Sequence, residues 1–335
     1  MSITAKELAK KLNLSAAAVS MALNNKPGVS SITRRTIFDA AEKYGYDFSK
    51  IPEKQTLTGP LYFVLYKKHG AIVSDTPFFS SLIEGITMEC SRENLTIQIK
   101  YIYDDEDTIS RQIEDLQYSD CSGIILLGTE MNPEDLVPFM ELPVPLVVLD
   151  TYFETTPCNY VLINNVQGAF LATNYLIRKC KNQPGYLRSS YPISNFAERA
   201  NGFFKAVRSA GMHTSGSITH SLSPSAEGAY ADMKEIILRK EKLATCYFAD
   251  NDLIAVGAMK ALKEFGFKIP EDVAIVGFDN LPISSIIEPG LTTINVPKQY
   301  MGQVAVQRIL TLINKPKVPP LKIDVSTTLI KRRTV

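Results

Sequence analysis

The first 46 residues contain three short helical patterns joined by tight connections, and no other feature constrains the local fold so closely. Thr4 and Glu7 have the spacing of a capping box, which predicts that a helix begins directly after Thr4. Ser15 is suited to cap a second helix over residues 16–23, and a third helix is expected after Ser30 or Ser31. The apolar residues expected to form the core of this unit are Leu8, Leu12, Val19, Leu23, Ile37, Ala41 and Tyr44. Two helices across a short turn, with a third packed against them, form the helix-turn-helix arrangement.

In a helix-turn-helix unit the second helix enters the major groove of DNA with its N-terminal end leading. Here that end is Ser15 followed by three alanines, and such small side chains let the backbone approach the base edges. We therefore expect the following residues to meet DNA: Thr4, Ser15, Ala16, Ala17, Ala18, Ser20, Met21, Asn24, Lys26, Ser30 and Arg34.

The charge distribution supports a nucleic-acid partner for this segment. Residues 1–46 carry seven Lys and Arg against three Asp and Glu, a net charge of +4, whereas the whole chain has +1, so the remainder sums to −3. Positive charge concentrated on one unit supplies affinity for phosphates. The alternative is an ordinary three-helix unit whose lysines form a solvated face.

From residue 61 onward, short apolar strands alternate with helical stretches, which is typical of parallel sheets covered by helices on both faces. The predicted strands are 61–66, 95–101, 123–127, 146–149, 185–188, 245–249 and 273–278, and the predicted helices are 79–93, 108–118, 166–180, 195–210, 226–240, 251–265 and 298–314. These elements suffice for two successive doubly wound α/β halves, in which ligands bind beyond the carboxyl ends of the strands.

Several classes of protein are disfavoured by what the sequence lacks. The N-terminus has no apolar signal-peptide core and no apolar run is long enough to cross a membrane, so we expect a cytoplasmic protein with no membrane partner. Five scattered cysteines without a CxxC pattern are expected to be buried or half-buried free thiols, and three histidines show no metal-ligand spacing. Because GxGxxG, GxxxxGK[ST], GxSxG and HExxH motifs are missing, we expect neither an enzyme nor a cofactor or metal.

The segment SAAAVSMALNNKPGVSSITRRTIFDAAEKYGY at 15–46 resembles the N-terminal domain of the LacI/GalR family of bacterial transcription regulators. Its Val-Ser, Leu-Asn, Gly-Val-Ser, Thr-Arg, Ala-Ala and Gly-Tyr steps follow the pattern of that family. The resemblance continues through SGIILLG at 122–128, FAERANGFFKAV at 196–207, ADNDLIAVGAMKAL at 249–262 and VAIVGFDNLP at 273–282. Ala18 and Met21 depart from it, since the family usually has Thr and often Arg there, so operator preference is not transferable.

The resemblance implies a periplasmic-binding-protein-like body behind the all-α head. The expected parts are a helix-turn-helix domain at 1–46, a hinge or linker at 47–60, and an effector-binding and dimerisation domain at 61–335. Within the body, the N-subdomain would comprise about 61–161 and 291–320, and the C-subdomain about 162–290 and 321–335. The linker lacks the Ala-Arg-x-Leu of the family hinge helix, so either Ile51 or Leu57 acts as a minor-groove wedge, or the run around Pro52 is a flexible tether.

The resemblance also implies where an effector binds. Arg199, Asn251 and Asp279 match family residues that contact effector, although Asn251 and Asp279 are also in positions to cap helices or turns. Phe78 and Phe79 match an aromatic position that stacks on an effector ring, and Asp150 at the end of a strand is a further candidate. Pro224 stands where some relatives have a stacking aromatic, and Asn164-Asn165 where they have Asp-Asn.

The function expected from these features is a ligand-responsive transcriptional regulator, more specifically a repressor. A homodimer, or a tetramer, would bind a near-palindromic double-stranded operator, and a small polar, carbohydrate-like effector between the subdomains would control it. Whether that effector releases DNA or promotes binding is left open. The alternatives are a sugar-binding-protein-like sensor without sequence-specific DNA binding, and a regulator controlled by a partner protein.

Overall fold

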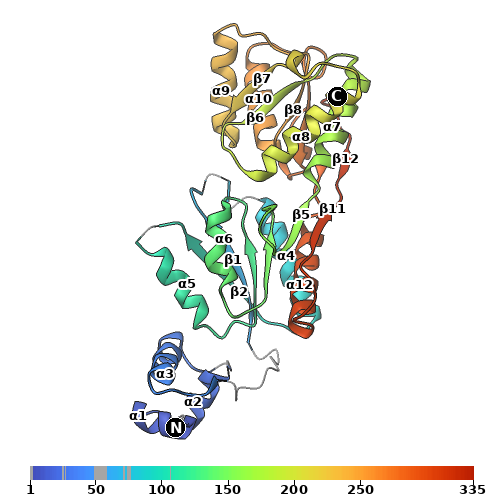
Figure 1. The fold of residues 1–335 in the computed structure, drawn as a ribbon. Helices are drawn as coiled ribbons and strands as arrows, with labels where there is room; N and C mark the ends of the chain where they lie inside the picture. Colours follow the sequence, from blue (N-terminus) through green and yellow to red (C-terminus); the bar gives the residue numbers. More distant parts are fainter. Residues whose placement is uncertain are drawn as a thin grey trace.

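A computed structural model of the chain describes residues 3–24, 26, 28–48, 59–70, 72–73, 77–105 and 107–335. It contains a small helical head, followed by two α/β lobes stacked end to end (Figure 1). The all-α head and the two doubly wound, predominantly parallel sheets confirm the fold class predicted from the sequence. Among the described residues no helix is both long enough and apolar enough to cross a membrane.

The head consists of α1 (Ala5–Leu12), α2 (Ala16–Leu23) and α3 (Ser31–Lys43). The predicted capping box is present, since the N–H of Thr4 donates to Glu7 Oε2 at 2.8 Å and the N–H of Glu7 donates to Thr4 Oγ1 at 3.3 Å. Ser15 and Ser30 cap α2 and α3, and Gly45 follows α3 with φ +68°, a left-handed conformation that suits glycine at a helix end.

The core of the head contains most of the predicted apolar residues: Leu8, Val19, Leu23, Ile37 and Ala41 are buried, and Leu12 packs against them half-buried. The prediction that Tyr44 lies in this core is wrong. Tyr44 is the C-cap of α3 and is 37% exposed. Its ring lies beneath the Lys11 ammonium, 3.8 Å from the ring centroid, so it contributes a cation–π contact at the surface.

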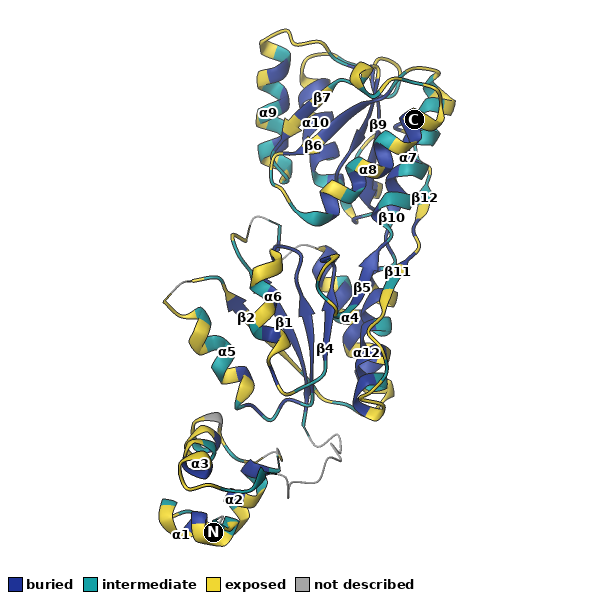
Figure 2. Ribbon diagram, viewed as in Figure 1, coloured by how far each residue is buried: buried dark blue, intermediate teal, exposed yellow. Residues whose placement is uncertain are grey.

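The first lobe contains a six-stranded parallel sheet in the order β11-β5-β4-β3-β1-β2. Its strands are β1 (Leu61–Lys67), β2 (Ile97–Tyr103), β3 (Gly123–Leu127), β4 (Leu146–Leu149), β5 (Asn159–Ile163) and β11 (Lys322–Val325). Alternate residues of β1 face opposite layers: Phe63 packs with α4 (Pro77–Arg92) and α12 (Lys298–Asn314), whereas Val64 packs with α5 (Ile109–Gln117) and α6 (Pro133–Met140). Both faces of the sheet are therefore covered, and Figure 2 shows its central strands buried.

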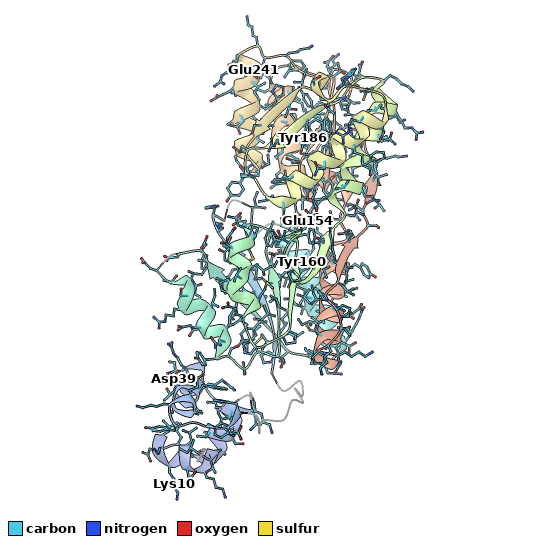
Figure 3. The ribbon with its side chains drawn as sticks, viewed as in Figure 1. Lys10, Asp39, Glu154, Tyr160, Tyr186 and Glu241 are labelled. Atoms are coloured by element: carbon cyan, nitrogen blue, oxygen red, sulfur yellow. The ribbon has the colours of Figure 1, made fainter. Side chains whose placement is uncertain are left out.

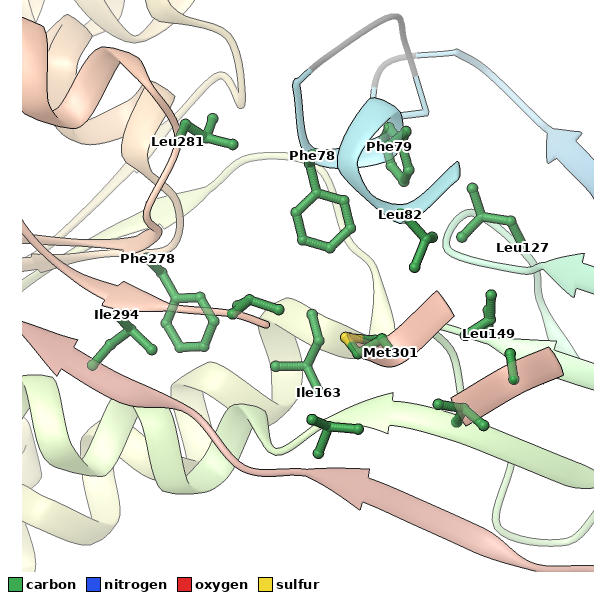
Figure 4. Packing of buried hydrophobic residues seen from close by; sticks show 14 of the residues in the cluster. Phe78, Phe79, Leu82, Leu127, Leu149, Ile163, Phe278, Leu281, Ile294 and Met301 are labelled. Carbon is green, nitrogen blue, oxygen red and sulfur yellow. The ribbon is translucent and has the colours of Figure 1, made fainter. Parts of the chain in front are cut away.

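The helices α4 and α12 approach each other closely on one face of the first sheet. A Cβ on Gly85 would lie 2.0 Å from the carbonyl oxygen of Gln299, and a Cβ on Gly302 would lie 2.6 Å from that of Leu82. Glycine at both positions therefore permits this packing. Figure 4 shows Leu82 and Met301 within the resulting cluster.

The second lobe repeats the arrangement with a sheet in the order β12-β10-β9-β8-β6-β7. Its strands are β6 (Gly185–Ser189), β7 (Thr219–Leu222), β8 (Cys246–Ala249), β9 (Ala274–Asp279), β10 (Thr292–Asn295) and β12 (Thr328–Ile330), the last of which pairs antiparallel. The helices α7 (Asn165–Cys180) and α8 (Ser194–Ser209) cover one face, and α9 (Ala226–Leu238) and α10 (Asp252–Glu264) cover the other. Tyr186, the second residue of β6, stacks on Phe203 and Phe248 inside this lobe (Figure 3).

The chain crosses between the lobes three times over residues 107–335: from β5 to α7, from β10 to α12, and from β11 to β12. This corrects the predicted subdomain boundaries. The strand at 292–295 pairs with β9 in the second lobe, and the strand at 322–325 pairs with β5 in the first. The first crossing follows residue 163, where β5 ends, and not residue 161. The second follows residue 295 and not 290, and the third follows residue 325 and not 320.

Candidate effector cleft and DNA-facing surface

A cleft lies between the lobes at the carboxyl ends of their strands and encloses about 650 Å³ of space, including its opening to solvent. The six residues predicted to bind an effector all line it: Phe78, Phe79, Asp150, Arg199, Asn251 and Asp279. The remaining lining residues are Ile72, Thr129, Ile193, Asn195, Phe196, Pro224, Ser225, Leu253 and Leu281. The structure thus brings together side chains from positions 72 to 281 in one cavity.

Arg199 is held by several groups of the second lobe. It projects from α8 and is buried; its Nε donates to Asn165 Oδ1 at 2.9 Å and its Nη1 donates to the carbonyl oxygen of Asp250. Its Nη2 donates to Asp279 Oδ1 at 3.1 Å, and its Cζ lies 3.8 Å from the ring centroid of Phe278. These contacts fix the plane of the guanidinium, so that it can present donors to a ligand without reorganising.

Asp279 ends β9 with φ +104°, an uncommon conformation for a side-chain-bearing residue. Besides the contact of its carboxylate with Arg199, its carbonyl oxygen accepts a hydrogen bond from Lys298 Nζ at 2.5 Å. Burial raises the pKa of Asp279, while the charges of Arg199 and Lys298 oppose that rise. The carboxylate does not cap the short α11 (Ile283–Ile286), whose N-cap is Pro282.

Asp150 supplies an acceptor from the first lobe. It follows β4 with φ +64°, and its Oδ2 accepts a hydrogen bond from Thr129 Oγ1 at 2.7 Å. Its buried Oδ1 has no hydrogen-bond partner among the described residues. Burial raises the pKa of Asp150 to about 6. A buried acceptor without a donor is costly, so the arrangement favours a ligand that brings a hydroxyl or amino hydrogen to this atom.

Asn251 caps a helix and also lies at the wall of the cleft. Its Oδ1 accepts a hydrogen bond from the N–H of Ile254 at 2.8 Å, which caps α10. Its Nδ2 lies 3.4 Å from the carbonyl oxygen of Pro224, and the side chain also lines the cleft. The capping explanation is therefore correct, and it fixes a polar group at the cleft wall.

The aromatic wall of the cleft comes from both lobes. Phe78 and Phe79 at the start of α4 are both buried, with ring centroids 5.1 Å apart in an edge-to-face arrangement (Figure 4). Both line the cleft, together with Phe196 of α8. Phe196 and Asn195 were missed as site residues, although their position at the start of the helix that carries Arg199 was a usable signal.

The DNA-facing surface predicted on the head is formed mainly by exposed residues. Thr4, Ser15, Ala16, Ala17, Ser20, Lys26 and Ser30 are exposed, and Ala18, Met21 and Asn24 are half-buried. The hydroxyl of Ser15 accepts a hydrogen bond from the N–H of Ala18 at 3.0 Å, and Asn24 Nδ2 donates to the carbonyl oxygen of Ser20 at 2.7 Å. The N-terminal half of α2 therefore presents a smooth, small-residue surface.

Arg34 requires a correction. It is 1% exposed, and its Nη1 and Nη2 donate to the carbonyl oxygens of Ala22 at 3.0 Å and Lys26 at 2.7 Å. The guanidinium therefore joins α3 to the segment that follows α2 and is not available to a phosphate. Residues 49–58 lie outside the described residues. They include Ile51 and Leu57, so the structure does not decide whether this segment acts as a minor-groove wedge or as a flexible tether.

Comparison with known proteins finds a matching domain model and relatives that are similar along nearly the whole chain. Residues 173–335 match the model of a periplasmic binding protein-like domain. The chain is 26% identical over 336 residues to the HTH-type transcriptional repressor PurR of Actinobacillus pleuropneumoniae serotype 3, covering 99% of this chain and 98% of that one. It is 29% identical over 310 residues to the HTH-type transcriptional regulator GalS of Salmonella typhimurium, covering 92% and 89% of the two chains.

Solved structures share the fold along the full length. The transcriptional regulator CelR in complex with cellobiose has a TM-score of 0.74 at 22% identity, with 99% of this chain and all of that chain covered. The lac repressor dimer bound to operator and the anti-inducer ONPF has a TM-score of 0.70 at 22% identity, with 100% and 99% covered. The helix-turn-helix head, the two-lobed body and the repressor relatives that match nearly the whole chain all support the resemblance of this chain to the LacI/GalR family of bacterial transcriptional regulators.

Proposed function

We propose that this protein is a dimeric, sequence-specific DNA-binding repressor whose affinity for its operator is controlled by a small polar effector bound between the lobes. The observation that carries this proposal is the pairing of two surfaces in one chain. An exposed alanine-rich α2 lies on a head with a net charge of +4, and a cleft lined by fixed polar groups lies in the body. Relatives that match nearly the whole chain are named as transcriptional repressors.

The head reads DNA through α2, with phosphates met by the basic side chains around it. The exposed cations are Lys6, Lys10, Lys11, Lys26, Arg35 and Lys43. Arg35 also forms an ion pair with Glu114 of α5 at 2.8 Å, half-exposed on both sides. One recognition helix covers too few base pairs for genomic specificity, so two heads act together on a near-palindromic site.

The body transmits the effector signal by the relative orientation of its lobes. Arg199, Asn251 and Asp279 belong to the second lobe, while Asp150 and Phe78 belong to the first. A ligand that contacts both sets stabilises one orientation over others, and it shifts DNA affinity by its differential binding to the two states. Because the acceptors Asp150 and Asp279 line the same cleft as the rings of Phe78, Phe79 and Phe196, a sugar or a related polyol fits the chemistry of the cleft.

The dimer surface is supported by apolar side chains left exposed on the first lobe. Ile99, Tyr101 and Tyr103 of the edge strand β2 are between 41% and 53% exposed, and Met88 of α4 is 41% exposed. A second copy would cover them, as edge strands with apolar side chains need a partner. We infer further that the protein works in the cytoplasm, as a regulator without catalytic activity.

The experiment that tests the proposal has two parts. Full-length protein is first used to select duplexes from a random library, and the selected duplex is then competed against random duplex at moderate ionic strength. Discrimination of about 10³-fold or more is expected for a specific regulator. Thermal shifts are then recorded with sugars, sugar phosphates and nucleosides, and a binder is tested for its effect on the DNA complex.

The rival functions give different outcomes. A sensor without DNA recognition would bind a ligand but show no preference between duplexes. A regulator controlled by a partner protein would discriminate duplexes but show no shift with any small molecule. Turnover of a bound metabolite would indicate an enzyme instead.

A further inference from the structure

Glu130, in the turn after β3, binds the backbone of a loop that is distant in the sequence. The side chain is 4% exposed, and its two oxygens accept hydrogen bonds from five backbone N–H groups. The donors to Oε2 are Lys68 at 2.9 Å, His69 at 3.1 Å and Gly70 at 3.0 Å, and the donors to Oε1 are Ile72 and Val73, each at 2.8 Å. The whole described part of the loop after β1 is thus attached to one carboxylate.

Five amide donors around a single carboxylate make a strong local restraint. Hydrogen bonds to a charged acceptor are stronger than neutral ones, and successive backbone N–H groups that converge on an anion fix the course of the chain. Burial works to raise the pKa of Glu130, but the N–H groups together hold it below its usual value. Lys68 adds a second attachment, because its Nζ pairs with Asp135 at 2.8 Å.

The loop that Glu130 holds contacts both the cleft and the second lobe. Ile72 lines the cleft. The ring of His69 meets the ring of Tyr191, which belongs to the second lobe, with centroids 5.6 Å apart and planes at 75°. Tyr191 is held in turn, because its N–H donates to Ser189 Oγ at 3.0 Å and its carbonyl oxygen accepts from the same hydroxyl.

The contact between His69 and Tyr191 lies far from the segments that connect the two lobes. Figure 1 shows the end of β1 on the side of the first lobe away from the three segments that cross between the lobes. Other direct contacts between the lobes include Thr151 Oγ1 with Ser194 Oγ at 3.0 Å and Asn195 Nδ2 with the carbonyl oxygen of Asp150 at 3.0 Å. A contact in this position can limit how closely the two lobes approach on the side away from the crossing segments.

We propose that Glu130 is a positioning residue for closure of the cleft: by holding residues 68–70 and 72–73 it places His69 against Tyr191 and Ile72 against the bound ligand. The importance of this role for effector binding rests on the proposed function. The contact between His69 and Tyr191 is tested without added effector or DNA, so the test can fail while the regulator proposal stands.

The test follows the three histidines of the full-length chain by NMR, with the imidazole Cε1 labelled with ¹³C. Tyr191→Leu removes the ring that faces His69, so the His69 signal moves toward its position in an unstructured peptide. Glu130→Gln, which loses the charge and one acceptor oxygen, is expected to move the His69 signal in the same direction. The signals of His213 and His220 stay in place in both variants because neither residue lies near the loop.

Hydrogen exchange supplies the second measurement. Glu130→Gln is expected to accelerate exchange of the amides at 68–70 and 72–73 by at least about tenfold, since each loses a charged acceptor. The matched control is Glu134→Gln, an exposed glutamate in the first turn of α6, which leaves the loop and the histidines unchanged. If Glu130→Gln does not fold, Glu130→Asp keeps the charge but reaches fewer of the N–H groups, and the same changes are expected in weaker form.

Three outcomes overturn the proposal. An unmoved His69 signal in Glu130→Gln would show that the carboxylate does not place the loop. An unmoved signal in Tyr191→Leu would show that the two rings do not meet. Changes at all three histidines and throughout the first lobe would show a general loss of fold rather than a local positioning role.

Discussion

Arg199 is the residue whose removal tests the electrostatics of the cleft most directly. It is a buried cation, and the buried Asp279 carboxylate depends on it for charge compensation. Arg199→Met leaves that carboxylate without its partner, which we expect to cost about 3–5 kcal/mol of unfolding free energy. Urea unfolding of the full chain provides the measurement.

The second arm of this experiment separates charge from packing. In the double variant Arg199→Met with Asp279→Asn, neither member of this pair remains as a charge without the other, so the loss should be smaller than the sum of the two single losses. Arg239→Met breaks an exposed pair with Glu235 and should cost no more than about 0.5 kcal/mol. Additive losses in the double variant would contradict the coupling.

The buried carboxylates of the second lobe make stability depend on pH. Burial, with the charge of Asp279, raises the pKa of Asp252 to about 7, against hydrogen bonds from Ser284, Thr293 and the N–H of Leu281. In the unfolded chain the pKa of an aspartate is about 4. Between pH values of about 4 and 7 the proton is therefore bound only in the folded state. The contribution to stability is therefore present at low pH and is lost as pH rises through about 7.

We expect the difference in unfolding free energy between wild type and Asp252→Asn to change by on the order of 1 kcal/mol between pH 6 and pH 8, with the wild type favoured at pH 6. Asp115→Asn on the exposed face of α5 serves as the control and should parallel the wild type. Parallel curves for Asp252→Asn as well would contradict the prediction.

For single residues, the sequence predicted which side chains line the cleft better than it predicted the contacts that each side chain makes. All six effector candidates line the cleft: five of them end or follow a strand or begin a helix at the carboxyl edge of one of the two sheets, and Arg199 lies in the second turn of α8. Arg34 was misassigned because helical periodicity does not reveal that a guanidinium can bury itself by binding the carbonyl oxygens that end another helix. The five N–H groups bound by Glu130 could not be predicted, since they connect residues about 60 positions apart.

Among the secondary-structure elements, seven strands were predicted, including the edge strand β2, whereas the interior strands β5 and β10 and the edge strands β7, β11 and β12 were missed. Gly123–Leu127 and Leu146–Leu149 are buried on both faces and therefore appear as continuous apolar runs. β7 (THSL), β11 (KIDV) and β12 (TLI) are short and half-exposed, so they lack such a run. α6 was also missed; it contains Pro133 in its first turn, where proline is tolerated, and Pro138 in its interior.

The recognition helix permits a test that leaves the fold intact. Ala17 is exposed on α2, so Ala17→Glu places a negative charge and a longer side chain where the base edges would be met. We expect at least about a hundredfold loss of affinity for the selected operator, with the melting temperature within about 2 °C of wild type. Competitive fluorescence anisotropy measures the affinity.

Ala210→Glu, at an exposed position after α8, is the matched control and should bind the operator as wild type does. If Ala17→Glu retained specific binding, α2 would not be the recognition helix.

For the molecule as a whole, the exposed apolar strand β2 predicts how two copies meet. Ile99→Glu combined with Tyr101→Glu places charges on this surface, and we expect the dimer dissociation constant to rise by at least about tenfold. Sedimentation velocity across a concentration series provides the measurement. Val137→Glu, on the exposed face of α6 at 51% exposure, is the control and should leave the dimer unchanged.

If the double variant remains as dimeric as the control, the subunits meet elsewhere, for example through Ile286 of the second lobe, which is 75% exposed. The exposed apolar surface of β2 could not be predicted from the sequence. Apolar residues in a strand predict burial, but they do not indicate whether the same chain or a second copy covers them.

The last residues of the chain serve both lobes at once. β11 forms one edge of the first sheet and β12, three residues later, forms one edge of the second. Beyond them, the hydroxyl of Thr334 donates to the carbonyl oxygen of Ile275 and accepts from the N–H of Thr292. A premature stop codon that removes only the final fifteen or so residues would therefore strip a strand from each sheet. Loss of so short a tail should abolish the sensor as completely as a deletion within either of its halves.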